Sequence, residues 1–232
     1  MSQFAGLSPK AFQFLVDLAM NNDRSWFQPR KTDYERLLKE PIEALCVALD
    51  AELAARGIPL AADPARSPFR IYRDVRFSKD KSPYKTHVSA SFPWTGRGGG
   101  VGGYVHLQPG ECYIGGGMWH PTTARLAAWR AKVVGERAAV HGVVNDPAFV
   151  AAFGSVSGDA LKRAPSGFAV DDPDIELLKL KDVTFGRRIT DDEACSADLP
   201  ATIAATFEPA VPLLGLLADL PGADEPSGWL RA

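Results

Sequence analysis

Cysteine, long apolar runs and net charge are all scarce in this chain of 232 residues. Its three cysteines, Cys46, Cys112 and Cys195, are an odd number at unrelated spacings, which argues against a disulfide framework or a zinc cluster. We expect no apolar run to reach the about 18–20 residues that span a bilayer. The chain also starts without a basic segment followed by an apolar one, so no secretory signal is predicted. These absences favour a cytoplasmic protein that does not contact a membrane.

The formal net charge is only -2, from 26 Lys and Arg against 28 Asp and Glu. A balance this close to zero argues against binding of nucleic acid over the whole surface. The charge is unevenly spread, however. Residues 66–85 carry seven cations and two anions, whereas residues 171–232 carry thirteen acids and five bases. A basic segment on an otherwise acidic protein favours a site for one small anion.

The hydrophobic share of 46% and the charged share of 23% are those of a globular protein, and the length fits one domain over residues 1–232. Ser8-Pro9 predicts the start of a first helix. Thr32-Asp33-Tyr34-Glu35 matches a capping box and predicts the start of a second, with a kink or a restart at Pro41.

Period-two alternation predicts strands over residues 69–77 and 86–92, and further strands are expected at 104–108, 112–119 and 183–189. A long helix is expected over residues 122–141, and prolines should divide residues 199–220 into short helices. The order of helices, strands and helices favours an α+β fold, with a central, mostly antiparallel sheet flanked by N-terminal and C-terminal helices.

The strongest local signal is the basic segment. If residues 69–77 form a strand, Arg73 shares a face with four apolar side chains, Phe69, Ile71, Val75 and Phe77. An unpaired charge there would be costly, so we expect Arg73 to pair with a carboxylate of the protein or with a ligand anion. Arginine is suited to bidentate contacts with carboxylates and phosphates.

We therefore predict a site for a small anionic ligand. Its ligand-binding residues would be Arg70, Arg73, Arg76, Lys79, Lys81, Tyr84 and Lys85. The arginines would hold the anion, the lysines would close over it, and Tyr84 would hydrogen-bond to it. The candidate catalytic residues are Asp74, which would orient an arginine or act as a base, and His87, whose ordinary pKa suits proton transfer. Alternatively, the arginines and aspartates form salt bridges on a solvated face of the sheet.

The run Arg70-x-x-Arg73-Asp74-x-Arg76-Phe77-x-x-Asp80-Lys81-x-x-Tyr84-Lys85 resembles the signature of a largely bacterial family, the domain of unknown function 2461. Four other stretches resemble it too: Asn22-x-Arg24-x-Trp26-Phe27, Gly115-Gly116-Gly117-x-Trp119, residues 161–168 and residues 177–181. The resemblance thus covers nearly the whole chain. It implies a single-domain bacterial protein and brings no established activity.

These stretches suggest further partners for the basic segment. Trp26, Phe27 and Trp119 are aromatic residues at expected loop positions, with core packing as the alternative. Cations are added by Lys162, Lys179 and Lys181, with a solvated face as the alternative.

Other signals are weaker. Gly98-x-Gly100-x-x-Gly103 is followed by a strand-like run rather than a helix, so we predict no nucleotide cofactor. His87 and His106 could face each other, with His120 nearby. No helical pair of histidines and no pair of cysteines supports a metal, so no metal site is predicted. Cys112 as a nucleophile has no supporting spacing.

Two rival functions remain open. Aromatic residues interleaved with cations, namely Tyr72, Phe77, Tyr84 and Trp94, are typical of single-stranded nucleic-acid binding, although the pI near 6.1 makes that less favoured. The second rival function is that of a non-catalytic structural or interaction protein, in which the salt bridges of the basic segment only hold the fold together.

Overall fold

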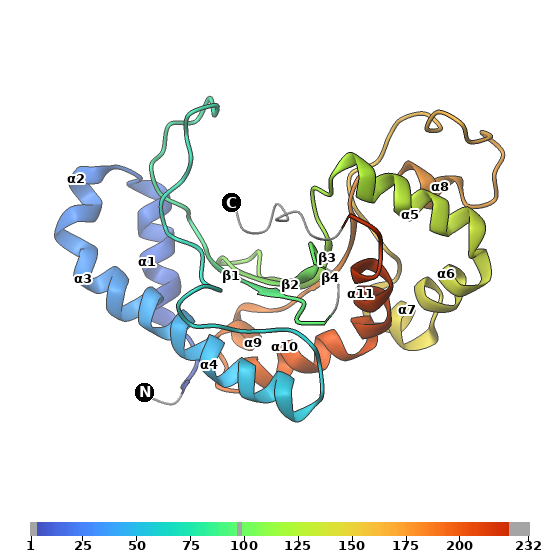
Figure 1. Ribbon diagram of the computed structural model, residues 1–232. Helices are drawn as coiled ribbons and strands as arrows, with labels where there is room; N and C mark the ends of the chain where they lie inside the picture. Colours follow the sequence, from blue (N-terminus) through green and yellow to red (C-terminus); the bar gives the residue numbers. More distant parts are fainter. Residues whose placement is uncertain (1–3, 97–98, 223–232) are drawn as a thin grey trace.

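The computed structural model describes residues 4–96 and 99–222, which form a four-stranded antiparallel sheet with helices around it (Figure 1). The strands follow the order of the chain, β1 (Val88–Pro93), β2 (Gly102–Leu107), β3 (Tyr113–Met118) and β4 (Val183–Arg188). The α+β prediction is confirmed, as are the strands expected within residues 86–119 and 183–189.

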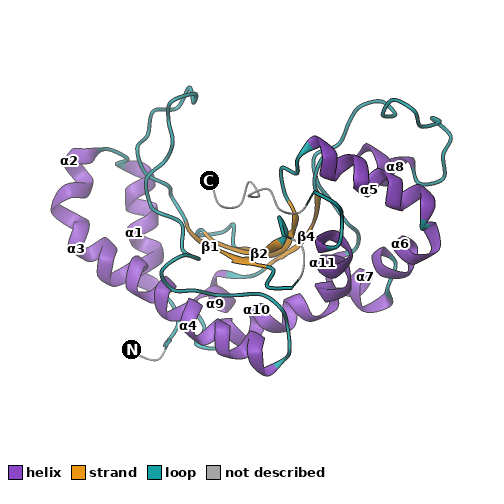
Figure 2. Cartoon of the chain, in the orientation of Figure 1, coloured by secondary structure: helices purple, strands orange, loops and turns teal. Residues whose placement is uncertain are grey.

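Helices precede the strands, separate β3 from β4, and follow β4 (Figure 2). They are α1 (Pro9–Met20), α2 (Arg24–Phe27), α3 (Lys31–Tyr34), α4 (Glu40–Ala55), α5 (Thr123–Gly135), α6 (Arg137–Val144), α7 (Pro147–Phe153), α8 (Ile175–Lys179), α9 (Asp191–Cys195), α10 (Leu199–Phe207) and α11 (Val211–Ala218). Shorter turns lie at η1 (Gln28–Arg30), η2 (Glu35–Lys39) and η3 (Glu208–Ala210).

The capping box expected at Thr32 is wrong. Helical turns run continuously from α2 to α4, so Thr32 lies inside the helical stretch and caps nothing. The element that accommodates Pro41 is η2, a π-helical turn directly before α4. Proline removes one N–H donor, and the wider turn absorbs that change without ending the helix.

The helix expected over residues 122–141 is two helices, α5 and α6, which meet at Glu136. The Thr122 side chain caps the start of α5, because it accepts a hydrogen bond from the Arg125 N–H at 3.3 Å. Trp129 is fully buried and donates its indole N–H to the Leu177 carbonyl at 3.1 Å. Val133 is buried, and the adjacent Val134 is 45% exposed because neighbouring residues of a helix do not share a face.

The two faces of the sheet differ in composition. The back face is apolar and packs against α4, α10 and α11. Its buried side chains are Val88, Ala90, Phe92, Val105, Leu107, Ile114, Met118, Val183 and Phe185. The ring of Phe92 meets that of Phe207 at 6.1 Å, and Gly103 leaves the room that this second ring occupies. The front face carries hydroxyl groups, rings and glycines instead.

The C-terminal stretch Leu199–Ala218 corrects one sequence expectation. By length and composition alone it could cross a membrane, with a mean hydropathy of 1.5 over its window. Half of that window is buried inside the protein, where residues such as Phe207 and Leu214 belong to the core under the sheet. Core packing therefore accounts for its apolar composition. As expected, prolines divide it, at the starts of α10, η3 and α11.

The strand expected over residues 69–77 is wrong. Residues 70–85, which we call the arm, project beyond the sheet as an extended loop that folds back on itself (Figure 1). Its two limbs are joined near the base by hydrogen bonds from Arg73 N to Pro83 O (2.9 Å) and from Lys85 N to Ile71 O (2.7 Å). Farther out on the arm, the carboxylates of Asp74 and Asp80 accept hydrogen bonds from nearby backbone N–H groups. These bonds take the place of the hydrogen bonds between strands.

Candidate functional site

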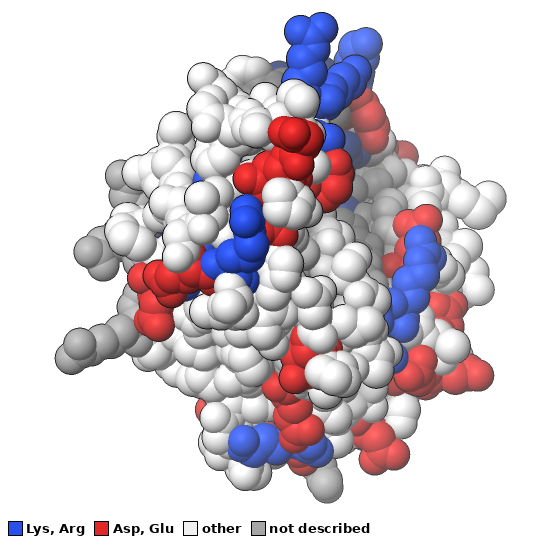
Figure 3. All heavy atoms as spheres, turned by 90° about the vertical axis from the view of Figure 1, so that its right-hand side faces the viewer, with Lys and Arg blue, Asp and Glu red and all other residues white. Residues whose placement is uncertain are grey.

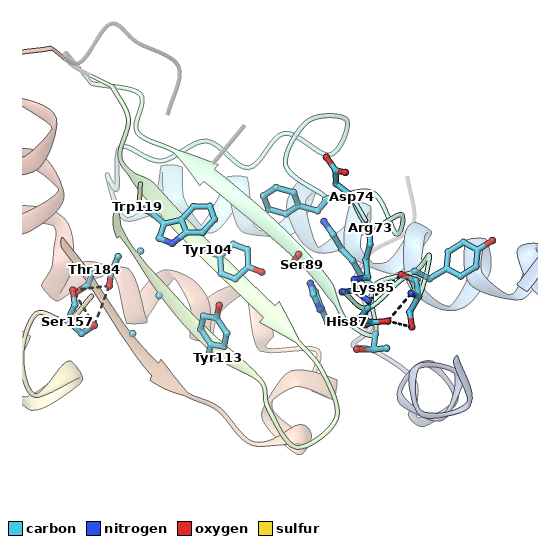
Figure 4. Close-up of a pocket in the computed structure, with 18 of the residues that line it drawn as sticks. Arg73, Asp74, Lys85, His87, Ser89, Tyr104, Tyr113, Trp119, Ser157 and Thr184 are labelled. Carbon is cyan, nitrogen blue, oxygen red and sulfur yellow. Dashed lines mark hydrogen bonds and ion pairs between the residues drawn. The ribbon is translucent and has the colours of Figure 1, made fainter. Parts of the chain in front are cut away.

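A cleft of about 990 Å³ lies over the front face of the sheet, beside the arm (Figure 4). Three parts of the chain line it. The arm and the segment after it contribute Arg73, Asp74, Asp80, Ser82, Tyr84, Lys85, Thr86 and His87. The sheet contributes Ser89, Tyr104, Tyr113, Gly115, Gly116, Thr184, Phe185 and Gly186, and other segments contribute Asn22, Phe69, Trp119 and Ser157.

The predicted site residues divide into two groups. Those that line the cleft are Arg73, Asp74, Tyr84, Lys85 and His87, whereas Arg70, Arg76, Lys79 and Lys81 do not line it. Arg76, Lys79 and Lys81 lie on the arm beyond its base, where the Arg76 side chain is 76% exposed, and Arg70 lies at the base itself. The single cluster of arginines and lysines that we predicted is therefore divided between the cleft, the base of the arm and its outer part.

Two arginine–aspartate pairs are formed within the arm. Arg73 pairs with Asp80 and also donates from Nη1 to the Ser82 carbonyl at 3.2 Å. Arg76 pairs with Asp74 at 2.6 Å. These are local ion pairs of the kind that the alternative interpretation expected, although they lie on a loop rather than across strands.

The same contacts set the basicity of the two carboxylates. The hydrogen bonds from Arg76 lower the pKa of Asp74 to about 2, and those from Ser82 and Arg73 hold the pKa of Asp80 well below its usual range. Both groups are therefore ionised near neutral pH. A carboxylate with so low a pKa is a weak general base, which argues against the base role that we predicted for Asp74.

Lys85 differs from the arginines. Its Nζ lies 5.0 Å from the centre of the Phe69 ring, and no carboxylate within residues 4–96 and 99–222 is within ion-pair distance of it. Burial, followed by repulsion from Arg70, lowers the pKa of the Lys85 ammonium. Lys85 therefore brings a half-buried positive charge to the cleft, and among the described residues its ammonium contacts a ring face and no carboxylate.

Tyr84 holds the arm in place. Its ring is 1% exposed and stacks on Phe27, with centroids 4.1 Å apart. The Asn22 side-chain amide bonds both main-chain groups of Tyr84, donating to its carbonyl at 2.9 Å and accepting from its N–H at 3.0 Å. These contacts make Tyr84 an anchor in the core, and the hydrogen bond from Tyr84 to a ligand stays a prediction.

The expected approach of two histidines is confirmed. The rings of His87 and His106 lie 4.1 Å apart, and His106 stacks on Tyr113 at 5.0 Å. The Tyr104 hydroxyl lies 3.3 Å from Nδ1 of His106. His120 is not part of this group, because its ring packs against Trp119 instead. Within the described parts of the chain, no three His, Cys, Asp or Glu side chains are grouped as metal ligands would be.

Burial keeps both histidines of this pair neutral. It is the largest cause that lowers the pKa of His87 to about 3, and the neighbouring His106, Lys85 and Arg73 lower it further. Burial also lowers the pKa of His106. A neutral imidazole has one N–H donor and one nitrogen that accepts a hydrogen bond. With a pKa of about 3, His87 is a weak general base near neutral pH, for the same reason as Asp74.

Sequence reasoning missed the aromatic middle of the cleft. Tyr104 and Tyr113 lie on neighbouring strands with ring centres 5.6 Å apart, and Gly115 pairs with Tyr104 in the β2–β3 register. The signal was present, because the spacings Tyr104-x-His106 and Tyr113-x-Gly115 place each pair on one face of its strand. These spacings indicate a site only when the strand register is known, because the register shows that both pairs lie on the front face.

Several suggested partners of the basic segment lie elsewhere. Trp26 packs on Phe14 at 5.5 Å, and Trp119 is the only one of the suggested aromatic residues in the described chain that lines the cleft. Lys179 pairs with Glu176 at 2.7 Å and Lys181 with Asp159 at 3.3 Å. Acidic and basic side chains alternate on the side of the molecule that Figure 3 shows, so no basic surface extends over it.

The glycine-rich stretch before β2 lies partly outside the described residues, because these omit residue 98, the first glycine of the dinucleotide-like run. The rest of the run agrees with the sequence interpretation. Its last glycine, Gly103, lies in a strand and not at the start of a helix, so no helix N-terminus is available there for a pyrophosphate.

Comparison with known proteins assigns the chain to a family. No curated protein and no solved structure matches it. Residues 10–215 match the family described as conserved hypothetical protein, domain of unknown function 2461. The matched range includes the arm, all four strands and most of the helices, in agreement with the resemblance carried by the arm. The chain therefore belongs to the family of conserved hypothetical proteins with the domain of unknown function 2461.

Proposed function

We propose that the cleft binds a small anionic ligand through a phosphate or carboxylate group. The observation that carries this proposal is Lys85, a half-buried ammonium at one end of the cleft that has no carboxylate partner within the described chain. Burying a cation without a counter-ion is costly. A bound anion would supply the missing charge, and in return a half-buried ammonium binds an anion more strongly than an exposed one does.

Arg73 is placed to assist Lys85. Its bonds to Asp80 and Ser82 both use Nη1, so Nε and Nη2 have no hydrogen-bond partner among the residues that the structure describes. A guanidinium has five N–H groups in a fixed fork. The Asp80 pair thus holds Arg73 in position and leaves donors for a ligand oxygen.

A second candidate function rests on the tip of the arm. Phe77 is 95% exposed, and Arg76 and Lys79 lie beside it in the chain. Exposed rings next to cations bind single-stranded nucleic acid by stacking and charge. The cleft is favoured over the tip because Lys85 is half-buried without a carboxylate partner in the described chain, whereas side chains of the tip such as Phe77 are exposed to water.

The test compares Lys85→Met with Lys79→Met, which removes a cation of the same arm outside the cleft. Isothermal titration with inorganic phosphate and with citrate measures anion affinity, and thermal melting checks that each variant is folded. Hydrogen bonds to charged groups contribute about 1.5–3 kcal/mol. We therefore expect Lys85→Met to weaken binding at least about 10-fold and Lys79→Met to leave it unchanged.

The other outcomes are distinct. Equal losses in both variants, or no anion binding at millimolar concentration, would contradict the proposal. A labelled single-stranded oligonucleotide that loses affinity with Lys79→Met and not with Lys85→Met would favour the nucleic-acid function. A variant Lys85→Met that melts earlier while the protein binds none of these ligands would favour an architectural role.

A further inference from the structure

Charge is confined to one end of the cleft. Its charged lining residues, Arg73, Asp74, Asp80 and Lys85, all belong to the arm, and the rest of the lining carries no Asp, Glu, Lys or Arg among the described residues. Figure 4 shows the order along the cleft, with Arg73 and Lys85 at one end, Tyr104 and Tyr113 in the middle, and Trp119 and Thr184 at the other end. If the proposed anion binds at this end beside Lys85 and Arg73, the rest of a ligand that fills the cleft meets an uncharged lining.

The middle of the cleft is built of rings that stay neutral. Burial raises the pKa of the Tyr104 phenol and, more strongly, that of the Tyr113 phenol. Phe69 meets the Tyr104 ring at 6.0 Å, and His106 stacks on Tyr113. The body of the ligand therefore meets ring faces and edges, which bind best to another flat ring.

Beside these rings, the front face of the sheet is formed by glycines, which have no side chain. Gly115 of β3 pairs with Gly186 of β4, and a Cβ at Gly115 would lie only 2.5 Å from the Phe185 carbonyl oxygen. Glycine is thus required for the strands to pair closely here. As a consequence, no side chain rises from this part of the sheet, and a flat group can approach the backbone.

The end of the cleft opposite Lys85 is lined by the Trp119 indole and by the hydroxyls of Ser157 and Thr184 (Figure 4). Trp119 follows β3 directly and is partly buried. The hydroxyls of Ser157 and Thr184 lie 3.3 Å apart, and each also bonds the other residue's carbonyl. These groups already satisfy each other, which leaves little to bind the several hydroxyls of a sugar.

We infer that the ligand is an aromatic anion, with its anionic group at Lys85 and Arg73 and its flat ring over the glycines between Tyr113 and Trp119. This inference rests on the proposed anion site and adds the class of the ligand. The rings supply stacking, the glycines supply room for a flat body, and the single charged end sets its direction in the cleft.

The test uses phenyl phosphate, inorganic phosphate and ribose 5-phosphate as probes in calorimetric titrations. Stacking of a ring on an aromatic side chain contributes about 1–3 kcal/mol. We expect phenyl phosphate to bind the unmodified protein at least about 5-fold more tightly than inorganic phosphate. Trp119→Ala should remove most of this difference without changing phosphate affinity, and Trp119→Phe should restore much of it.

Saturation-transfer NMR on the phenyl protons provides a second readout, which does not depend on whether Trp119→Ala folds. We expect transfer from the unmodified protein to the ring, and its loss when excess citrate occupies the site. If inorganic phosphate binds through Lys85 and the phenyl group adds nothing, this inference is wrong and the anion site stands. Equal or tighter binding of ribose 5-phosphate would also overturn it. If none of the three probes binds, the anion site fails as well.

Discussion

The two faces of the four-stranded sheet are made from the same strands and carry different chemistry. On the back face, residues such as Phe92 and Ile114 are fully buried against helices. On the front face, residues such as Tyr104 and Gly115 line a cleft of about 990 Å³. Successive side chains of a strand point to opposite faces, so each strand contributes to both the core and the cleft.

The difference shows how each face is stabilised. The back face gains its free energy from apolar area removed from water, at about 25 cal/mol per Å². The front face is held by ring contacts around Tyr113 and His106 and by the arm, which Asn22 ties down through hydrogen bonds. Changes on the back face should therefore affect folding most, and changes on the front face should affect binding most.

The largest expected effect is the difference in the free energy of unfolding between Phe92→Ala on the back face and Tyr113→Ala on the front face. Phe92 is fully buried and meets Phe207, so its removal leaves a cavity in the core. Such a change lowers the free energy of unfolding by about 3–5 kcal/mol. Tyr113 is 38% exposed at the cleft, and we expect its loss to cost less than about 1 kcal/mol. Urea denaturation of both variants measures the difference, and equal losses would remove the distinction between the faces.

The sequence predicted the strands of the sheet, most clearly β1, because apolar and polar residues alternate there. In β1, the run Val88-Ser89-Ala90-Ser91-Phe92 alternates apolar and polar residues, and its apolar set packs on the helices. Alternation alone was misleading in the arm. Ile71 is buried and Phe77 is 95% exposed, because an extended loop alternates its side chains as a strand does, without a neighbouring strand to pair with.

The cleft was predicted only in part, and the reason is physical. The charges at Arg73 and Lys85 stand out in the sequence, but the ion pair of Arg73 with Asp80 depends on how the arm folds back. The contribution of Tyr104 and Tyr113 depends on the register between β2 and β3. Both depend on which parts of the chain meet in the fold, and the local sequence pattern does not report it.

The next effect in size is the pH dependence contributed by His87. Its pKa is about 3 in the folded protein and about 6.5 when unfolded. Between these values the unfolded state binds more protons, so stability is fully present above about pH 6.5 and falls as the pH drops toward 3. From pH 6.5 to pH 5 this loss amounts to at most about 2 kcal/mol. His87→Gln should remove this part of the pH dependence.

Unfolding free energies at pH 7 and pH 5 for the two proteins measure this contribution. His120→Gln is the matched control, because His120 is exposed and packs on Trp119 outside the histidine pair. We expect the control to keep the pH dependence of the unmodified protein. If His87→Gln keeps it as well, the front face does not enclose a neutral histidine as the structure indicates.

The smallest effect concerns how the arm is attached to the front of the molecule. Asn22→Ala removes two hydrogen bonds to the main chain of Tyr84 and leaves the stacking on Phe27 in place. Each such bond contributes about 0.5–1.5 kcal/mol, so the two together contribute about 1–3 kcal/mol. We expect the loss in the free energy of unfolding to lie near the lower end of this range, because the stacking of Tyr84 on Phe27 still holds the arm. Asn21→Ala is the control, because the Asn21 side chain bonds only the Asp17 carbonyl of the preceding helix α1 within the described chain and does not reach the arm. Faster proteolysis within the arm of Asn22→Ala, and not of Asn21→Ala, would show that hydrogen bonds rather than core packing hold this wall of the cleft.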